Sequence, residues 1–169
     1  YTNATKKVLA IGTREKVYVN YDNQWYDITP VGFSGDAASS PLGYGAYTYN
    51  VESYGDARSQ SDLGFITKPF SFDNFGENLI FCCGSDPKVY KWRPDDGSGN
   101  PDSVAVELDA QIRGSQGVLV TNERHIFSFG ITTDPRIVKW SSRETDNVWA
   151  ATSTNTAGDL KVTSGGTIM

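Results

Sequence analysis

Residues 79–92 read LIFCCGSDPKVYKW, an apolar run that ends on Gly84 and is followed, after a Ser-Asp-Pro turn, by a second short apolar stretch. Runs of four to six apolar or alternating residues, bounded by Gly, Pro and Asp, are typical of β-strands joined by tight turns. The stretch therefore predicts an antiparallel hairpin with strands at residues 79–83 and 89–92.

The same order of features occurs twice more. Residues 8–12 read VLAIG and residues 125–130 read HIFSFG, and each is followed by a turn, a basic residue and a short apolar stretch. In the last two units that stretch ends on Trp92 or Trp140, and the two units begin about 46 residues apart, near the repeat length of a β-propeller blade. We predict an all-β fold of antiparallel blade-like sheets, a partial or incomplete β-propeller, with Trp92 and Trp140 in equivalent core positions.

Sustained helical periodicity is absent from the sequence. The short apolar stretches predict strands at residues 7–11, 16–21, 24–28, 79–83, 89–92, 103–108, 117–121, 125–129, 136–140 and 159–162. Each unit should have a third strand, and in the last unit this strand lies either around Trp149 or around Leu160.

Composition agrees with this fold. The 169 residues include nine Tyr, eight Phe, four Trp and 17 Gly but one Met, which favours strands and turns over helices. With 38% hydrophobic and 21% charged residues, the chain is not a disordered segment. We expect a single domain over residues 1–169, and a piece of a longer chain, because the sequence starts on Tyr1 and a new apolar stretch opens at residues 167–169.

A longer segment, residues 31–69, separates the first and second units and is rich in Gly, Ser, Ala and Tyr. It has no periodicity and exceeds ordinary loop length, which favours a functional segment. Alternating Tyr and Gly is common in adaptable contact surfaces, so Tyr44, Tyr47, Tyr49 and Tyr54 are candidate contact residues. A solvent-exposed linker is the equal alternative.

Charge and motif content argue against several classes of function. The net charge is −5 and no basic run occurs, so we expect no direct contact with nucleic acid. No apolar run approaches the roughly 18 residues that span a bilayer, so we expect no membrane contact. His125 is the single histidine, and it has no nearby partners in the sequence for a zinc site or a catalytic triad. The adjacent Cys82 and Cys83 should point to opposite faces of a strand, so they do not form a metal-binding pair.

Three remaining candidates fit structural roles better. Residues 95–102 read DDGSGNPD, but glycines occupy the third and fifth positions, where an EF-hand needs oxygen ligands. The acidic residues fall mostly in turns. Trp92, Trp140 and Trp149 could form an aromatic platform for a sugar ring, although burial in the blade cores is favoured. We expect no enzyme, no cofactor, no metal and no small-molecule substrate.

Several stretches resemble a recurring pattern in structural proteins of tailed bacteriophages. They are residues 70–80 (FSFDNFGENLI) with 89–92, residues 122–130 (NERHIFSFG) with 134–142 (DPRIVKWSS), and residues 146–149 (DNVW) with 154–160 (TNTAGDL), preceded by residues 25–30 (WYDITP). The resemblance covers nearly the whole chain. It implies a β-propeller-like virion protein of the tail or head-to-tail region, made in the host cytoplasm, with other virion proteins or copies of itself as partners and no catalytic residues to carry over.

Two other functions stay open. A carbohydrate-binding or receptor-binding module would expose Trp or Tyr beside Asp or Asn, and the burial of Trp25 and Trp149 tests it. A glycan-degrading enzyme would place two carboxylates roughly 5 to 9.5 Å apart in a cleft.

Overall fold

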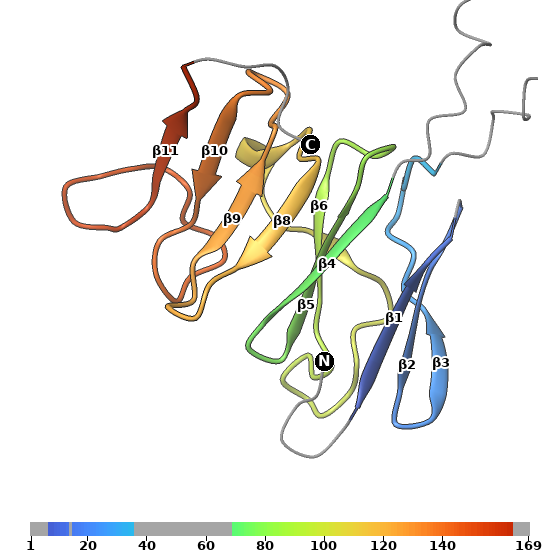
Figure 1. The fold of residues 1–169 in the computed structure, drawn as a ribbon. Coiled ribbons are helices and arrows are strands. Elements are labelled where there is room, and N and C mark those ends of the chain that lie inside the picture. The colour runs from blue at the N-terminus through green and yellow to red at the C-terminus, as the bar shows by residue number, and fades with distance from the viewer. Residues whose placement is uncertain (1–6, 14, 36–68, 164–169) are drawn as a thin grey trace, which may run out of the picture.

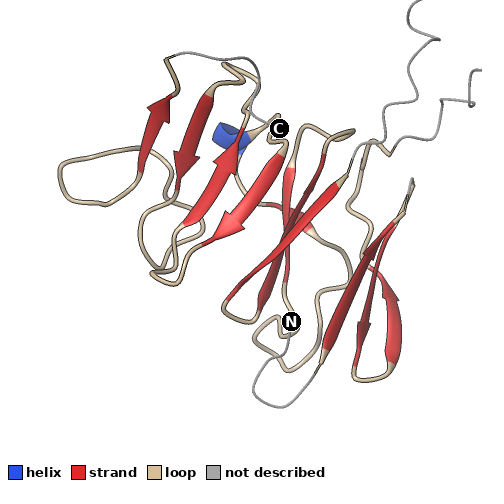
Figure 2. Ribbon diagram, in the orientation of Figure 1, coloured by secondary structure: helices blue, strands red, loops and turns tan. Residues whose placement is uncertain are grey.

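The structure, a computed structural model, describes residues 7–13, 15–35 and 69–163. Within these ranges the regular elements are strands, apart from one short 3-10 helix, Ala110–Ile112 (Figure 2). The all-β class predicted from the sequence is confirmed.

Sheet 1 is a meander of β1 (Val8–Gly12), β2 (Val17–Tyr21) and β3 (Gln24–Asp27). Alternation along β2 buries Val17, Val19 and Tyr21 on one face. Asp22 and Asn23 turn the chain into β3 with φ of 54° and 62°, a conformation that Asp and Asn adopt more readily than other side chains. The local sequence therefore sets both the hairpin and its buried face.

Sheet 2 contains β4 (Phe70–Phe75), β5 (Asn78–Cys83), β6 (Val89–Trp92) and β7 (Val106–Glu107), each antiparallel to the next. The predicted hairpin of residues 79–92 is formed by β5 and β6. From Leu79 to Cys83 every residue of β5 is buried. A continuous apolar run of this kind is expected for a strand that is covered on both faces.

Sheet 3 contains β8 (Gly117–Val120), β9 (Ile126–Phe129), β10 (Ile137–Trp140) and β11 (Gly158–Lys161), again in chain order. The third strand of this unit thus includes Leu160. Trp149 lies instead in the connection between β10 and β11, where its side chain is buried.

The three sheets stand in series, with sheet 2 between the other two (Figure 1). One core cluster joins sheets 1 and 2 and another joins sheets 2 and 3, and burial of each large apolar side chain contributes about 1.5–3 kcal/mol. The first cluster includes Val8, Val17, Val19, Ile28, Leu79, Phe81, Tyr90 and Trp92. The second includes Phe75, Ile80, Cys82, Val89, Ile112, Val118, Ile126 and Trp149. Within the described residues the sheets close into neither a barrel nor a ring, which is the incomplete arrangement that the sequence predicted.

Strand β4 is absent from the sequence-based prediction, although its residues FSFDNF alternate with period two. Phe70 and Phe72 pack against the first core cluster. The side chains between them point to sheet 3, where Ser71 Oγ lies 3.1 Å from the backbone nitrogen of Val118. Asp73 Oδ2 accepts a hydrogen bond from the backbone N–H of Val120 at 2.6 Å. β4 therefore connects both neighbouring sheets.

Candidate interaction surfaces

The candidate contact residues of the insertion, Tyr44, Tyr47, Tyr49 and Tyr54, lie outside the described residues. The start of that segment is described and is attached to sheet 2. The Phe33 ring lies 6.2 Å from the Phe70 ring and 6.1 Å from the Tyr90 ring, measured between centroids. The backbone N–H of Ser34 donates to Asp86 Oδ2 at 2.6 Å.

Asp86 is a buried carboxylate that has three donors from the chain. Besides Ser34, the backbone N–H of Lys88 and the hydroxyl of Tyr90 donate to it, at 2.9 and 3.0 Å. Burial, and next the negative charge of Asp86, raise the pKa of the Tyr90 hydroxyl, which therefore stays a donor. Because these bonds hold the insertion start and β6 together, the arrangement fits a structural role.

The two tryptophans of the repeated motif lie in different surroundings. Trp92 is fully buried in the first core cluster, and its Nε1 donates to the carbonyl oxygen of Asp102 at 2.8 Å. Trp140 is half-buried on the face of sheet 3 that points away from sheet 2, and its ring stacks on Phe127 with centroids 5.6 Å apart. The equivalent core positions expected from the sequence are therefore not found.

The preceding turns explain this difference. Phe75 pairs with Asn78, so β4 and β5 are joined by Gly76 and Glu77. In sheet 3 the backbone N–H of Thr121 donates to the carbonyl oxygen of His125, so the turn between β8 and β9 has three residues, one more than the turn between β4 and β5. The last residue of this longer turn, Arg124, has a φ of 62°. A shift of one residue in register turns every following side chain to the other face of the sheet.

The outward face of sheet 1 carries several exposed apolar side chains, together with Asn20 and Asp27, which pair opposite Trp25 and Tyr18. Leu9 and Ile11 of β1 and Trp25 of β3 are 55%, 41% and 57% exposed. Tyr18 joins them, because it pairs opposite Ile11 in the sheet. We call Leu9, Ile11, Tyr18 and Trp25 the sheet 1 end face.

The outward face of sheet 3 is also apolar. Its aromatic side chains form a stacked row, with Phe127 between Phe129 and Trp140 at centroid distances of 6.5 and 5.6 Å. Leu119 and Leu160 flank the row and are 48% and 61% exposed. We call these five residues the sheet 3 end face. It lies at the opposite end of the stack from the sheet 1 end face (Figure 1).

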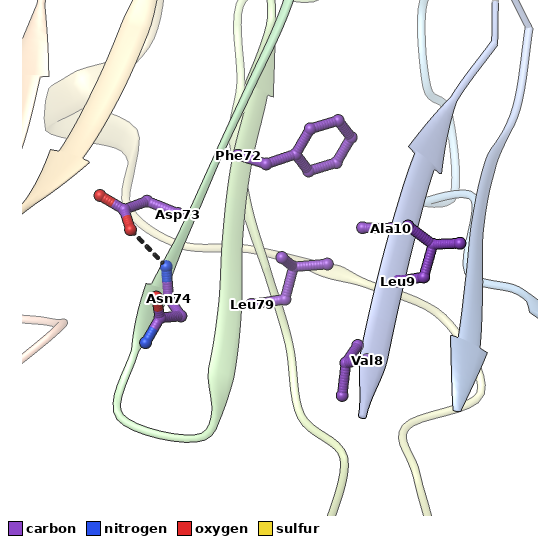
Figure 3. Close-up of a pocket in the computed structure, with 7 residues that line it drawn as sticks. All are labelled: Val8, Leu9, Ala10, Phe72, Asp73, Asn74 and Leu79. Carbon is purple, nitrogen blue, oxygen red and sulfur yellow. Dashed lines mark hydrogen bonds between the residues drawn. The ribbon is translucent and has the colours of Figure 1, made fainter. Parts of the chain in front are cut away.

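A groove of about 260 Å³ runs between β1 and β4 (Figure 3). We call it the β1–β4 groove, and it is lined by Val8, Leu9, Ala10, Phe72, Asp73, Asn74 and Leu79. Its volume lies below the usual range for small-molecule sites. Asp73 is the one carboxylate among the lining residues, so the groove does not offer the carboxylate pair of a glycoside hydrolase.

The other polar candidates have partners within the fold. His125 Nδ1 lies 2.8 Å from the carbonyl oxygen of Ser141. Asp95 Oδ1 accepts the backbone N–H groups of Gly97 and Gly99, so the acidic loop is a turn held by its own backbone. Across residues 7–13, 15–35 and 69–163, no cluster of His, Cys, Asp and Glu is arranged to hold a metal ion.

The two cysteines are both buried and unbridged. Sequence reasoning placed one in the core and the other on the second face, and both faces of this strand are covered. Burial, followed by the neighbouring Cys83, raises the pKa of the Cys82 thiol to about 12, so this thiol is protonated near neutral pH. A role in nucleophilic chemistry is therefore disfavoured for Cys82.

Among the described residues, no helix has the length and apolar character needed to cross a membrane. Comparisons with protein-family models, with curated proteins and with solved structures gave no match to this chain.

Proposed function

We propose that the chain is a non-enzymatic structural protein of a tailed-phage virion, a tail or head-to-tail component that binds other virion proteins or copies of itself. The observation that carries the contact role is the pair of apolar end faces at opposite ends of the sheet stack (Figure 1). The phage assignment is supported by the resemblance of residues 70–80, 122–130 and 134–142 to structural proteins of such particles.

Covering these faces would be favourable. Trp25, Leu9 and Leu160 each keep more than half of their surface in water, and complete burial of such a side chain contributes about 1.5–3 kcal/mol. Trp and Tyr are among the residues that dominate binding energy at protein interfaces, and the two end faces include Trp25, Tyr18 and Trp140. A stack with an apolar face at both ends can bind a partner at each end.

Light scattering after size exclusion measures self-association of the purified chain. We expect a discrete oligomer, and we expect Ile11→Ser with Trp25→Ser to weaken its association at least tenfold. Val31→Ser is the matched control, because Val31 is 85% exposed but lies outside both end faces. Equal loss of association in both variants would contradict a specific contact through the sheet 1 end face.

Mass spectrometry of purified particles tests the virion assignment directly. Peptides from this chain should copurify with intact particles in a constant ratio to the other structural proteins. Complete and infectious particles that lack the chain would overturn the proposal.

Trp25 also favours a second candidate, a carbohydrate-binding module. Trp25 is 57% exposed and pairs opposite Asn20, so an aromatic side chain and an amide lie side by side. Trp149 is 1% exposed and is not available for such a role. Glycan-array binding that Trp25→Ala abolishes would support this function, and a blank array with the native chain would reject it.

A further inference from the structure

Strand β11 is the outermost strand of sheet 3, and one of its edges is open. It pairs with β10 on one side, and among the described residues no strand pairs with it on the other (Figure 1). The N–H of Val162 donates to the carbonyl oxygen of Arg136 at 3.0 Å, which continues the ladder to β10. By alternation, the backbone groups of Asp159 and Lys161 point away from β10, toward the open edge. Such a row of backbone donors and acceptors is a template for pairing with another strand.

The charged side chains at this edge are self-complementary. Asp159 is exposed, and Lys139, which pairs opposite it on β10, donates to Gln111 rather than to its carboxylate. The Lys161 side chain lies on the same face as Asp159 and is 52% exposed, although it also pairs with Asp134 of its own chain. When two β11 strands run antiparallel about a twofold axis at Leu160, each Asp159 lies opposite Lys161 of the second copy. Opposite charges on directly opposed residues stabilise a strand pair.

The apolar side chains of β11 fit the same axis. Leu160 is 61% exposed and would meet Leu160 of the second copy on the axis. Val162 is 38% exposed and would lie opposite Gly158 of the second copy. A Cβ on Gly158 would lie 2.5 Å from the Trp140 ring, so this ring covers Gly158 and Val162 would pack against it. The pairing would therefore cover two exposed apolar side chains of each chain and extend the sheet 3 end face across both copies.

We propose that two copies of this chain pair through the open edges of β11, antiparallel and about a twofold axis at Leu160. Asp159 of each copy exchanges a reciprocal pair of backbone hydrogen bonds with Lys161 of the other. The two copies of sheet 3 then form one continuous sheet, and the interface is isologous because the same strand serves on both sides. The pairing specifies a contact between copies, and the inference rests on the self-association in the proposed function.

The outer edge of β3 does not offer the same complementarity. The N–H of Ile28 donates to the carbonyl oxygen of Val17 at 3.0 Å, which continues the ladder between β3 and β2. By alternation, the backbone groups of Trp25 and Asp27 point away from β2. Two β3 strands paired about Tyr26 would place Trp25 opposite Asp27, with no opposite charge across the new pair. Of these two outer edges, β11 is therefore the one that fits a second copy of itself.

Charge reversal tests the pairing in sedimentation equilibrium. Asp159→Lys and Lys161→Asp each place two like-charge pairs across the axis, and each should weaken self-association about tenfold. An equimolar mixture of the two variants should recover the native affinity, because the new lysine of one chain then lies opposite the new aspartate of the other. Glu123→Lys is the matched control, because it makes the same change in net charge at an exposed turn outside β11, and it should leave the association unchanged.

A disulfide at the axis tests the register. Opposite residues in a non-hydrogen-bonded antiparallel pair have Cα atoms about 4.5 Å apart, which is within the range of a disulfide. Leu160→Cys should therefore give a disulfide-linked dimer on oxidation. Leu119→Cys is the matched control, because Leu119 is 48% exposed on the same face but lies on β8, at the other side of sheet 3, and it should stay unlinked.

Two results would overturn the inference directly. One is a folded Leu160→Cys chain that crosslinks no faster than Leu119→Cys, and the other is a mixture of the charge-reversal variants that associates no better than either variant alone. An oligomer that survives Asp159→Lys but is lost in Ile11→Ser with Trp25→Ser would also overturn it while leaving the proposed function intact. Absence of the chain from virions would contradict the virion assignment alone, because the pairing is measured on the purified chain.

Discussion

Ser71 and Val118 form a reciprocal pair across two sheets. The Ser71 hydroxyl donates to the carbonyl oxygen of Val118 at 3.0 Å, and the N–H of Val118 donates back to Ser71 Oγ at 3.1 Å. One side chain of sheet 2 thereby satisfies two backbone groups on the edge of sheet 3. Sheets 2 and 3 are therefore joined by directed hydrogen bonds in addition to apolar packing.

Replacing Ser71 with alanine should destabilise the fold. The substitution leaves a backbone donor and an acceptor of Val118 without partners in a partly buried position, which costs about 1–3 kcal/mol. Urea unfolding of Ser71→Ala measures the loss. Ser103→Ala, at an exposed position, should stay within about 0.5 kcal/mol of the native chain. Equal stabilities for the two variants would contradict the role of the pair.

Gly12 and Gly117 should respond differently to a methyl group. A Cβ on Gly12 would lie 2.5 Å from the Phe70 ring, whereas a Cβ on Gly117 would meet its nearest atom at 3.8 Å. Gly12→Ala should therefore lower the free energy of unfolding by about 1–3 kcal/mol through overpacking, with Gly117→Ala close to neutral. Thermal unfolding of both variants checks this. A neutral Gly12→Ala would show that Phe70 can move aside.

The hydrogen bond from the Tyr90 hydroxyl to Asp86 should contribute measurably to the free energy of unfolding. Its hydrogen bond goes to a buried carboxylate, so Tyr90→Phe should cost about 1.5–3 kcal/mol of unfolding free energy. Tyr26→Phe is the control, because the Tyr26 hydroxyl donates to Gln24 at an exposed site. Chemical denaturation of both variants gives the comparison. The prediction fails if the control loses as much stability as Tyr90→Phe.

The ion pair of Lys16 and Asp27 predicts a small dependence of stability on pH. The hydrogen bond from Lys16, and then that from the Thr29 hydroxyl, lower the pKa of Asp27 to about 2. A pKa that is lower in the folded chain than its value of about 3.9 in the unfolded chain stabilises the fold above about pH 4, and this contribution is lost as the pH falls toward 2.

Both side chains of this pair are roughly half exposed, so the contribution at neutral pH should stay below about 1 kcal/mol. The measurement is the difference in unfolding free energy between the native chain and Asp27→Asn at several pH values. The difference should be largest near pH 7 and shrink below pH 4. A difference that does not change with pH would exclude the ion pair as its source.

The strand pattern was largely predictable because it depends on neighbours in sequence. The stretches around residues 79–92, 125–129 and 136–140 formed strands where alternation and turn residues predicted them. β4 was missed, although the alternation of Phe70, Ser71, Phe72 and Asp73 was a usable signal. The end-face residues, Trp25 among them, were not identified as a surface, because alternation shows that a strand has two faces without showing which is covered.

Sequence by itself determined the all-β class, the hairpins and the incomplete set of three sheets. The signals for these features, turn residues and period-two alternation, depend only on residues that are close together in the chain. Only the tertiary structure decided that Trp92 faces a neighbouring sheet while Trp140 faces outward. One additional residue in the turn before β9 shifts the register by one, and the consequence appears only when the sheets pack together. The β1–β4 groove likewise exists only in three dimensions, because its walls come from strands about sixty residues apart in the chain.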